Sequence, residues 1–189
     1  MPLPPPTERV TMHAREVVCR GYRRADGLWD IEARVTDRKG YAVHNDHRTV
    51  EPGTPFHDMA LRVTLDDSLL IHAIEACIDS GPHRICPAVT PNFQRLVGLR
   101  IATGFGPELR RLVGGVHGCT HLGELFGPLA TAAIQTIHPL RRGFSGADPA
   151  ARPAPIDTCH ALAATGAVVA KYWPRFHVRP ERAAVGAEA

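Results

Sequence analysis

Cys119, His121 and Glu124 lie close together in the stretch GGVHGCTHLGEL and carry the side chains best suited to chemistry. A thiolate and an imidazole are both metal ligands, and each can also serve in nucleophilic or acid–base catalysis. His121 and Glu124 are three residues apart, so they are neighbours on one turn of a helix. We therefore predict a functional site here, with Cys119, His121 and Glu124 as its catalytic residues if the protein is an enzyme. The sequence leaves that condition open.

An amphipathic helix after Cys119 would fix the direction of these side chains. Thr120 suits the N-cap position, and Gly114 and Gly115 end any earlier helix. Cys119 then lies at a helix N-terminus, where free N–H groups and the helix dipole favour a thiolate. The apolar residues recur with the three-and-four spacing of a helix, and they predict a buried stripe of Leu122, Leu125, Phe126, Leu129, Ala133, Ile134 and Ile137.

Cysteines and histidines elsewhere in the chain suggest that this site binds a metal. Thiolate and imidazole ligands suit zinc or iron; a closed set of four is typical of structural sites and an open set of catalytic ones. The chain has no CxxC pair, and free cysteines are often simply small buried apolar side chains. The predicted metal ligands are Cys86, Cys119, His121, Cys159 and His57, with His117 and His160 in reserve.

Two alternatives make no use of a metal. In the first, Cys119 is a nucleophile activated by the helix N-terminus and a neighbouring histidine, and it accepts an acyl group from a thioester such as an acyl-CoA. Tyr22 and Arg23 are then candidates to bind the cofactor, for example a CoA phosphate, although arginines on a hairpin are usually just solvated. In the second, the protein is a non-catalytic subunit that binds a protein partner.

His57 and Asp58 form a second candidate pair, as a base with its orienting carboxylate or as a ligand with its hydrogen-bond partner. Adjacent residues of a strand point to opposite faces of the sheet, however, so these two side chains need not touch. A histidine at the start of a strand can also simply cap a loop.

Two hairpins are expected to form the sheet. The segments 15–24 and 28–37 read as strands joined by a turn at Asp26-Gly27, and Trp29 and Ile31 begin a strict alternation of apolar and polar residues. A second hairpin is expected from 57–65 and 69–79. Alternation of this kind implies one buried sheet face and one polar face. The predicted fold is α+β, with an antiparallel sheet packed against a few helices in a single domain.

Helices are expected after the second hairpin, at about 90–97, at 108–113 and from residue 120 onwards. The domain is predicted to span residues 15–178, between a flexible proline-rich lead at 1–14 and a frayed tail at 179–189. Within it we predict a surface linker at 139–155 and a turn or short hairpin around Thr165-Gly166.

The composition is ordinary for a globular protein: 189 residues, 44% apolar, 22% charged and a net charge of +3. The small, scattered positive charge does not favour nucleic-acid binding, and no apolar run is long enough for a membrane span. The N-terminus does not resemble a secretory signal, and five cysteines without close pairing do not indicate a disulfide framework. We therefore expect a cytoplasmic protein.

Three long motifs, GYRRADGLWDIEARVTD, PFHDMALRVTLDD and GCTHLGELFGPLATAAIQT, resemble an uncharacterised bacterial family, the domain of unknown function two-eight-eight-nine. The resemblance extends to Trp173–Arg175 and implies a role beside acyl-CoA or aromatic catabolism. The residues that match are Tyr22, Arg23, Asp26, Gly27, Trp29, Asp30, Glu32, His57, Asp58, Met59, Cys86, Cys119, His121, Glu124, Cys159 and His160. A weaker similarity to iron–sulfur scaffold proteins, which also lead from a hairpin into helices, rests on fold analogy alone.

Overall fold

The computed structural model describes residues 3–45, 47–142 and 151–179, and for residues 141 and 142 it describes only the backbone. The chain divides into two compact units, Met1–Ile137 and His138–Ala189. The first unit contains the sheet and the predicted site. The limits predicted for the domain, its lead and its tail stay predictions.

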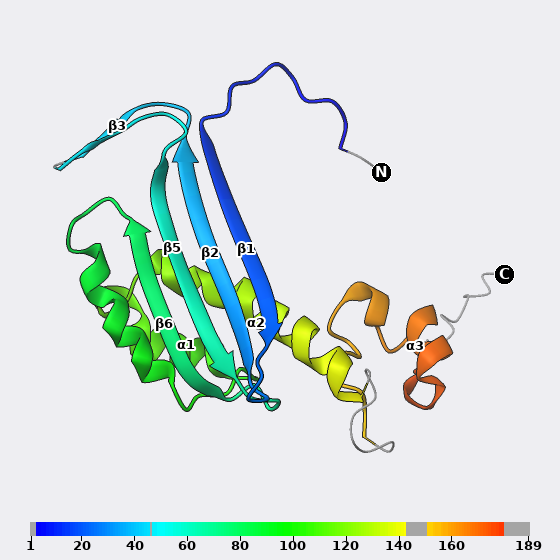
Figure 1. Cartoon of the computed structure of the whole chain (residues 1–189). Coiled ribbons are helices and arrows are strands. Elements are labelled where there is room, and N and C mark those ends of the chain that lie inside the picture. The colour runs from blue at the N-terminus through cyan, green and yellow to red at the C-terminus, as the bar shows by residue number, and fades with distance from the viewer. Residues whose placement is uncertain (1–2, 46, 143–150, 180–189) are drawn as a thin grey trace. The chain divides into compact units, whose positions relative to one another are not determined.

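A four-stranded antiparallel sheet forms the first unit, in the order β1-β2-β5-β6 (Figure 1). These strands are β1 (His13–Arg23), β2 (Trp29–Lys39), β5 (Pro55–Leu65) and β6 (Ile71–Ser80). Two short strands, β3 (Val43–His44) and β4 (Thr49–Val50), pair with each other in the connection between β2 and β5. Both predicted hairpins are present, and the α+β prediction is confirmed.

The helices follow the sheet in the sequence. The first unit contains the 3₁₀ segments η1 (Cys86–Leu96) and η2 (Gly115–His117), the helix α1 (Phe105–Val113) and most of α2 (Thr120–Arg142). In the second unit lie η3 (His160–Leu162), α3 (Ala167–Tyr172) and η4 (Pro174–Phe176). Of the turn or short hairpin predicted around Thr165-Gly166, the turn is present: it contains residues 164 and 165, and the N–H of Gly166 donates to the carbonyl of Ala163 at 2.8 Å. The hairpin alternative is wrong, because Gly166 is the N-cap residue of α3 and Val169 is buried in that helix.

The linker predicted at 139–155 differs in part from the structure. Its first residues continue α2 as far as Arg142, and residues 143–150 lie outside the described part of the chain. The helix predicted at 90–97 is present as the end of η1, which begins earlier, at Cys86.

The hydrophobic core lies between one face of the sheet and the helices of the first unit, η1, α1 and α2, which cover that face (Figure 1). Alternate residues of β2 and β5 point into it, as the period of two requires. The predicted stripe of α2 is buried except for Ile134, which is 42% exposed. Among the described residues, no helix is long and apolar enough to cross a membrane.

Close packing of α2 on β1 depends on a glycine. A Cβ atom at Gly21 would lie 2.1 Å from Oγ1 of Thr136 on α2. Glycine therefore lets the helix approach the edge strand of the sheet more closely than any other residue would.

The outer face of the sheet carries charged side chains in ion-pair ladders. Arg62 on β5 pairs with Glu32 on β2 and Glu75 on β6, and Arg34 on β2 pairs with Asp58 on β5 and with Asp79 on β6. Such cross-strand pairs explain the acidic residues of β2 without a catalytic role.

Candidate metal and acid–base site

The site is built on a row of three polar residues that crosses three strands. Arg15 on β1 lies opposite Asp37 on β2, and Asp37 lies opposite His57 on β5. All three belong to the sheet face that the helices cover, at the end where β5 begins. The pairing of β2 with β5 shifts by one residue between Asp37 and Arg38, so the row lies beside a bulge.

Asp37 is the centre of the cluster and is only 1% exposed. The guanidinium of Arg15 donates to both carboxylate oxygens, with Nε 2.8 Å from Oδ1 and Nη2 2.9 Å from Oδ2. Nε2 of His13 lies 3.4 Å from Oδ1. The hydrogen bonds from Arg15 lower the pKa of Asp37 from 3.8 to about 2, against the effect of burial, so this carboxylate is ionised at neutral pH.

His57 contacts Asp37 from the other side, with Nδ1 2.9 Å from Oδ2. Burial lowers the pKa of His57, and the nearby His121 lowers it further, although Asp37 opposes both effects. The imidazole is therefore neutral at pH 7. In metal-free protein its Nδ1–H donates to Asp37, which leaves the Nε2 lone pair as an acceptor.

The first turn of α2 completes the cluster. The N–H of Gly123 donates to the carbonyl of Cys119 at 2.8 Å, so the N-cap residue is Cys119 rather than Thr120 as predicted. Gly118 precedes it in a close turn, where a Cβ atom would lie 1.7 Å from the carbonyl oxygen of Val113. Because α2 begins directly after this turn, His121 in its first turn faces Asp37 and His57.

His121 and Glu124 reach the cluster in different ways. The ring of His121 lies 3.9 Å from the ring of His57, measured between centroids, and its Nε2 lies 4.0 Å from Oδ2 of Asp37. Oε2 of Glu124 accepts a hydrogen bond of 2.7 Å from Nη1 of Arg15. Arg15 is thus paired with two carboxylates, and its pKa is raised, mainly by Asp37.

Asp37, His57 and His121 could hold a metal ion. Each offers one ligand atom, and these atoms all lie within 4.8 Å of one another. Two imidazoles and one carboxylate are a donor set typical of zinc and of non-haem iron. Within the part of the chain that the structure describes, this is the one such group of three or more histidine, cysteine or acidic side chains, and it contains no cysteine.

No predicted cysteine ligand belongs to this group of three. Sγ of Cys119 lies 3.8 Å from Sδ of Met59 and is half-buried against the core. Cys86 lies at the start of η1, within contact distance of Gly81, and Cys159 belongs to the second compact unit. Whether any of these thiols binds a metal stays a prediction.

The other predicted site residues, Tyr22, Arg23 and Asp58, lie on strands of the sheet. Tyr22 and Arg23 are consecutive on β1, so their side chains point to opposite faces of the sheet. The guanidinium of Arg23 lies over the ring of Trp29, 5.5 Å from its centroid. Asp58 faces outward and pairs with Arg34, and the carboxylate that orients His57 is Asp37.

Three residues of the cluster, His13, Arg15 and Asp37, were not predicted from the sequence. A signal for two of them was present, because extending the first hairpin in register from its Asp26-Gly27 turn places Arg15 opposite Asp37. The contact between Asp37 and His57 joins two different hairpins, so it cannot be predicted from the sequence pattern of either hairpin alone.

The model of a protein family described as a protein of unknown function, DUF2889, matches residues 13–135. The chain belongs to this family. The resemblance found in the sequence motifs is thereby confirmed for DUF2889, although the match ends before Cys159 and the stretch Trp173–Arg175. No curated protein and no solved structure shows significant similarity to the chain.

The DUF2889 match covers the whole cluster. It begins at His13, the first residue of β1, and includes every side chain that contacts Asp37. The second compact unit, which starts at His138, lies outside it. The cluster is therefore part of the DUF2889 domain.

Proposed function

We propose that the protein binds a divalent transition metal, zinc or iron, through His57, His121 and Asp37. The observation that carries the proposal is the buried carboxylate of Asp37, with one imidazole 2.9 Å from its Oδ2 and a second at 4.0 Å. Ligand atoms of a bound metal are separated by distances of this order, roughly 3 Å for bonds of about 2.0–2.2 Å. The neutral state of His57 also suits a ligand, since coordination requires a free lone pair.

An open site fits this cluster better than a closed structural one. Only three ligands converge among the described residues, and the side chains of His121 and Glu124 are 26% and 56% exposed. Catalytic zinc and iron sites typically have three protein ligands and leave a position for water or substrate. We infer a site that can bind a further ligand, which is compatible with an enzyme acting in catabolism.

A second candidate function is favoured by Arg15. Its guanidinium donates to both oxygens of Asp37, so the carboxylate is neutralised before any metal arrives. Asp37 would then act only to orient His57, and the Nε2 lone pair of His57 would be a general base without a metal. In this case the 2.9 Å contact between Nδ1 of His57 and Oδ2 of Asp37 is a hydrogen bond, and neither atom binds a metal ion.

Metal content separates the two candidates. The protein is purified anaerobically from cells supplied with zinc and iron, its metals are measured by elemental analysis, and the metal-free form is titrated with Co²⁺ while visible absorption is recorded. We expect about one metal ion per chain. Loss of a protein ligand should abolish most of this binding, so His57→Ala and His121→Ala are the test variants.

His72→Ala is the matched control. His72 also pairs with an aspartate, with Nε2 3.2 Å from Oδ2 of Asp66, but it lies on β6 outside the cluster. The His72→Ala protein should therefore bind the same amount of metal as the unmodified protein. Folded protein that carries no metal and gives no Co²⁺ spectrum would overturn the metal proposal and favour the acid–base candidate, which NMR titration of His57 would then test.

A further inference from the structure

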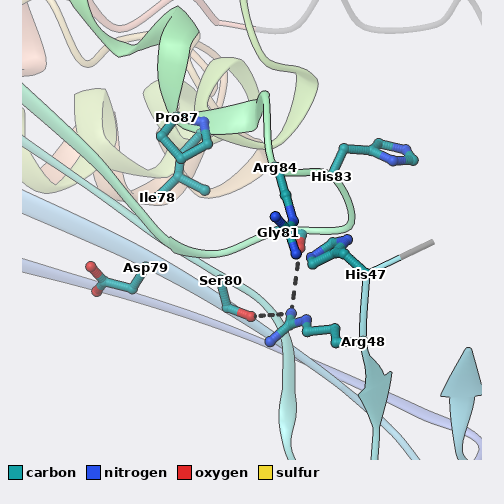
Figure 2. Close-up of a pocket in the computed structure, with 9 residues that line it drawn as sticks. All are labelled: His47, Arg48, Ile78, Asp79, Ser80, Gly81, His83, Arg84 and Pro87. Atoms are coloured by element: carbon teal, nitrogen blue, oxygen red, sulfur yellow. Dashed lines mark hydrogen bonds between the residues drawn. The ribbon is translucent and has the colours of Figure 1, made fainter. Parts of the chain in front are cut away.

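A small basic pocket lies beside the end of β6, apart from the Asp37 cluster. It has a volume of about 180 Å³, and its polar lining includes His47, Arg48, Ser80, Gly81, His83 and Arg84 (Figure 2). Four of these six residues carry cationic or imidazole side chains. Drug-sized ligands occupy pockets of about 300–1,000 Å³, so this one suits a single small group.

Arg48 is fixed in the pocket by neutral oxygen atoms. Nη2 donates to Oγ of Ser80 at 2.6 Å, and it lies 3.4 Å from the carbonyl oxygen of Gly81 and 3.5 Å from that of Phe56. Ser80 is itself held, since its hydroxyl donates to the carbonyl of Pro55 at 2.9 Å. The guanidinium is therefore ordered before any ligand binds.

The charge of Arg48 is not neutralised within the described part of the chain. Arg15, Arg34 and Arg62 each pair with carboxylates, whereas Arg48 has no carboxylate partner among the described residues. Its Nε is buried and has no hydrogen-bond acceptor there. A buried cationic group without a neutralising partner costs free energy, which a nearby anion would offset through its charge.

Among the described residues, the one acidic residue that lines the pocket is already paired elsewhere. Oδ2 of Asp79 accepts from Nη2 of Arg34 at 2.9 Å, and Figure 2 shows its carboxylate pointing away from Arg48. Arg84 is exposed and makes no hydrogen bond or ion pair with other described residues. Among the described residues, Arg48 and Arg84 therefore leave an excess of positive charge on this side of the pocket.

We propose that this pocket binds a phosphate-type oxyanion, either as free inorganic phosphate or as the phosphate group of a small organic molecule. Arginine donates in a fixed fork that matches phosphate oxygens, and histidine adds a ring N–H donor. The site is separate from the proposed metal site, although Arg48 contacts the carbonyl of Phe56, the residue before His57.

Isothermal titration calorimetry of the metal-free full chain tests this proposal, with inorganic phosphate and phenyl phosphate as probes at constant ionic strength. We expect saturable binding of at least one probe; tighter binding of phenyl phosphate would identify an organic phosphate as the ligand. Arg84→Gln should weaken binding about tenfold, the effect of losing one charge-assisted hydrogen bond. Arg48→Gln should weaken it at least as much, with folding checked by circular dichroism.

Arg110→Gln is the matched control, because Arg110 is also exposed but lies on α1. The affinity of the Arg110→Gln protein for phosphate should stay within about twofold of that of the unmodified protein. Absence of saturable binding, or an equal loss in Arg110→Gln, would overturn the proposal. So would a loss in Arg15→Gln without one in Arg84→Gln, because it would place the anion at the Asp37 cluster.

Discussion

At the scale of single residues, Asp37 determines the chemistry of the cluster. It is a buried carboxylate that holds one guanidinium and one imidazole, and it approaches a second imidazole. Removing its charge would leave Arg15 with Glu124 as its remaining acidic partner and would free Nδ1 of His57. The charge state of this one side chain therefore affects both the stability of the protein and the properties of the site.

The free energy of unfolding of the metal-free protein should depend on pH through Asp37. Its pKa is about 2 in the folded protein, below the ordinary value of 3.8, so its contribution of about 2 kcal/mol is present above pH 4 and is lost between pH 4 and pH 2. His57 should also lower the free energy of unfolding as the pH falls, but from pH 6.5 downwards. Its pKa is lowered in the folded protein, so the unfolded chain binds the proton more readily.

Urea unfolding of the unmodified protein and of Asp37→Asn at several pH values measures this contribution. The difference between the two proteins should shrink as the pH falls from 4 to 2. Arg15→Gln is a matched variant in which the pH dependence should be weaker, since Arg15 is the main cause of the lowered pKa. A difference that stays constant over this range would contradict the assignment.

The sequence analysis predicted the two histidines of the cluster as metal ligands, but it did not predict the carboxylate of Asp37. His57 and His121 were predicted as ligands because imidazole is a common ligand type and both lie next to polar residues. Cysteines were included for the same reason, but ligand type alone does not say which side chains converge. Asp37 looked like the last residue of an ordinary strand, and only the pairing of β2 with β5 gives it a role.

At the scale of elements, the contact of α2 with β1 holds the two parts of the site together. His13 and Arg15 lie on β1, and His121 and Glu124 lie on α2. The helix can approach the strand closely because residue 21 has no side chain.

Gly21→Val should therefore destabilise the protein. The added side chain would clash with Thr136, and overpacking of this kind costs about 1–3 kcal/mol. Thermal unfolding followed by circular dichroism measures the effect. Gly123→Ala is a control of opposite sign, because nothing lies within 4 Å of its added Cβ and alanine favours a helix by about 1 kcal/mol. An unchanged melting temperature for Gly21→Val would contradict this prediction, because it would show that α2 leaves room for a side chain at residue 21 of β1.

Elements with a strong local period were predictable from the sequence, and the others were not. The strands β2 and β5 alternate strictly, and α2 repeats its apolar residues with helical spacing. By contrast, η1 contains prolines and has no sustained period, so only its end was expected. The short α3 offered too few residues to distinguish a helix from a turn.

At the scale of the whole molecule, two boundaries nearly coincide. The DUF2889 match ends at residue 135, and the first compact unit ends at Ile137. The sheet, its core and all residues of the proposed metal site and the phosphate pocket lie before that point. We infer that this part of the chain is sufficient for both sites.

A chain shortened to residues 1–142, which keeps α2 entire, tests this inference. We expect it to unfold cooperatively and to bind Co²⁺ with the affinity of the full chain within about threefold, since no metal ligand is removed. Circular dichroism melting and the Co²⁺ titration measure both properties, with the full chain as the control. An unfolded product would mean that residues beyond 142 are needed for the first unit to fold.

Arg15 and Glu124 are 109 residues apart in the sequence, and between them Asp37, His57 and His121 lie on β2, β5 and α2. An unfolded chain would have to close long loops before its carboxylate and imidazoles could meet around one ion. A metal therefore cannot template folding here as it does in a zinc finger, where the ligands are close in sequence. It would act afterwards, by slowing the unfolding of a protein that is already complete. The resistance of this protein to heat and proteolysis in a cell would then follow the local supply of metal, whereas its rate of folding would not.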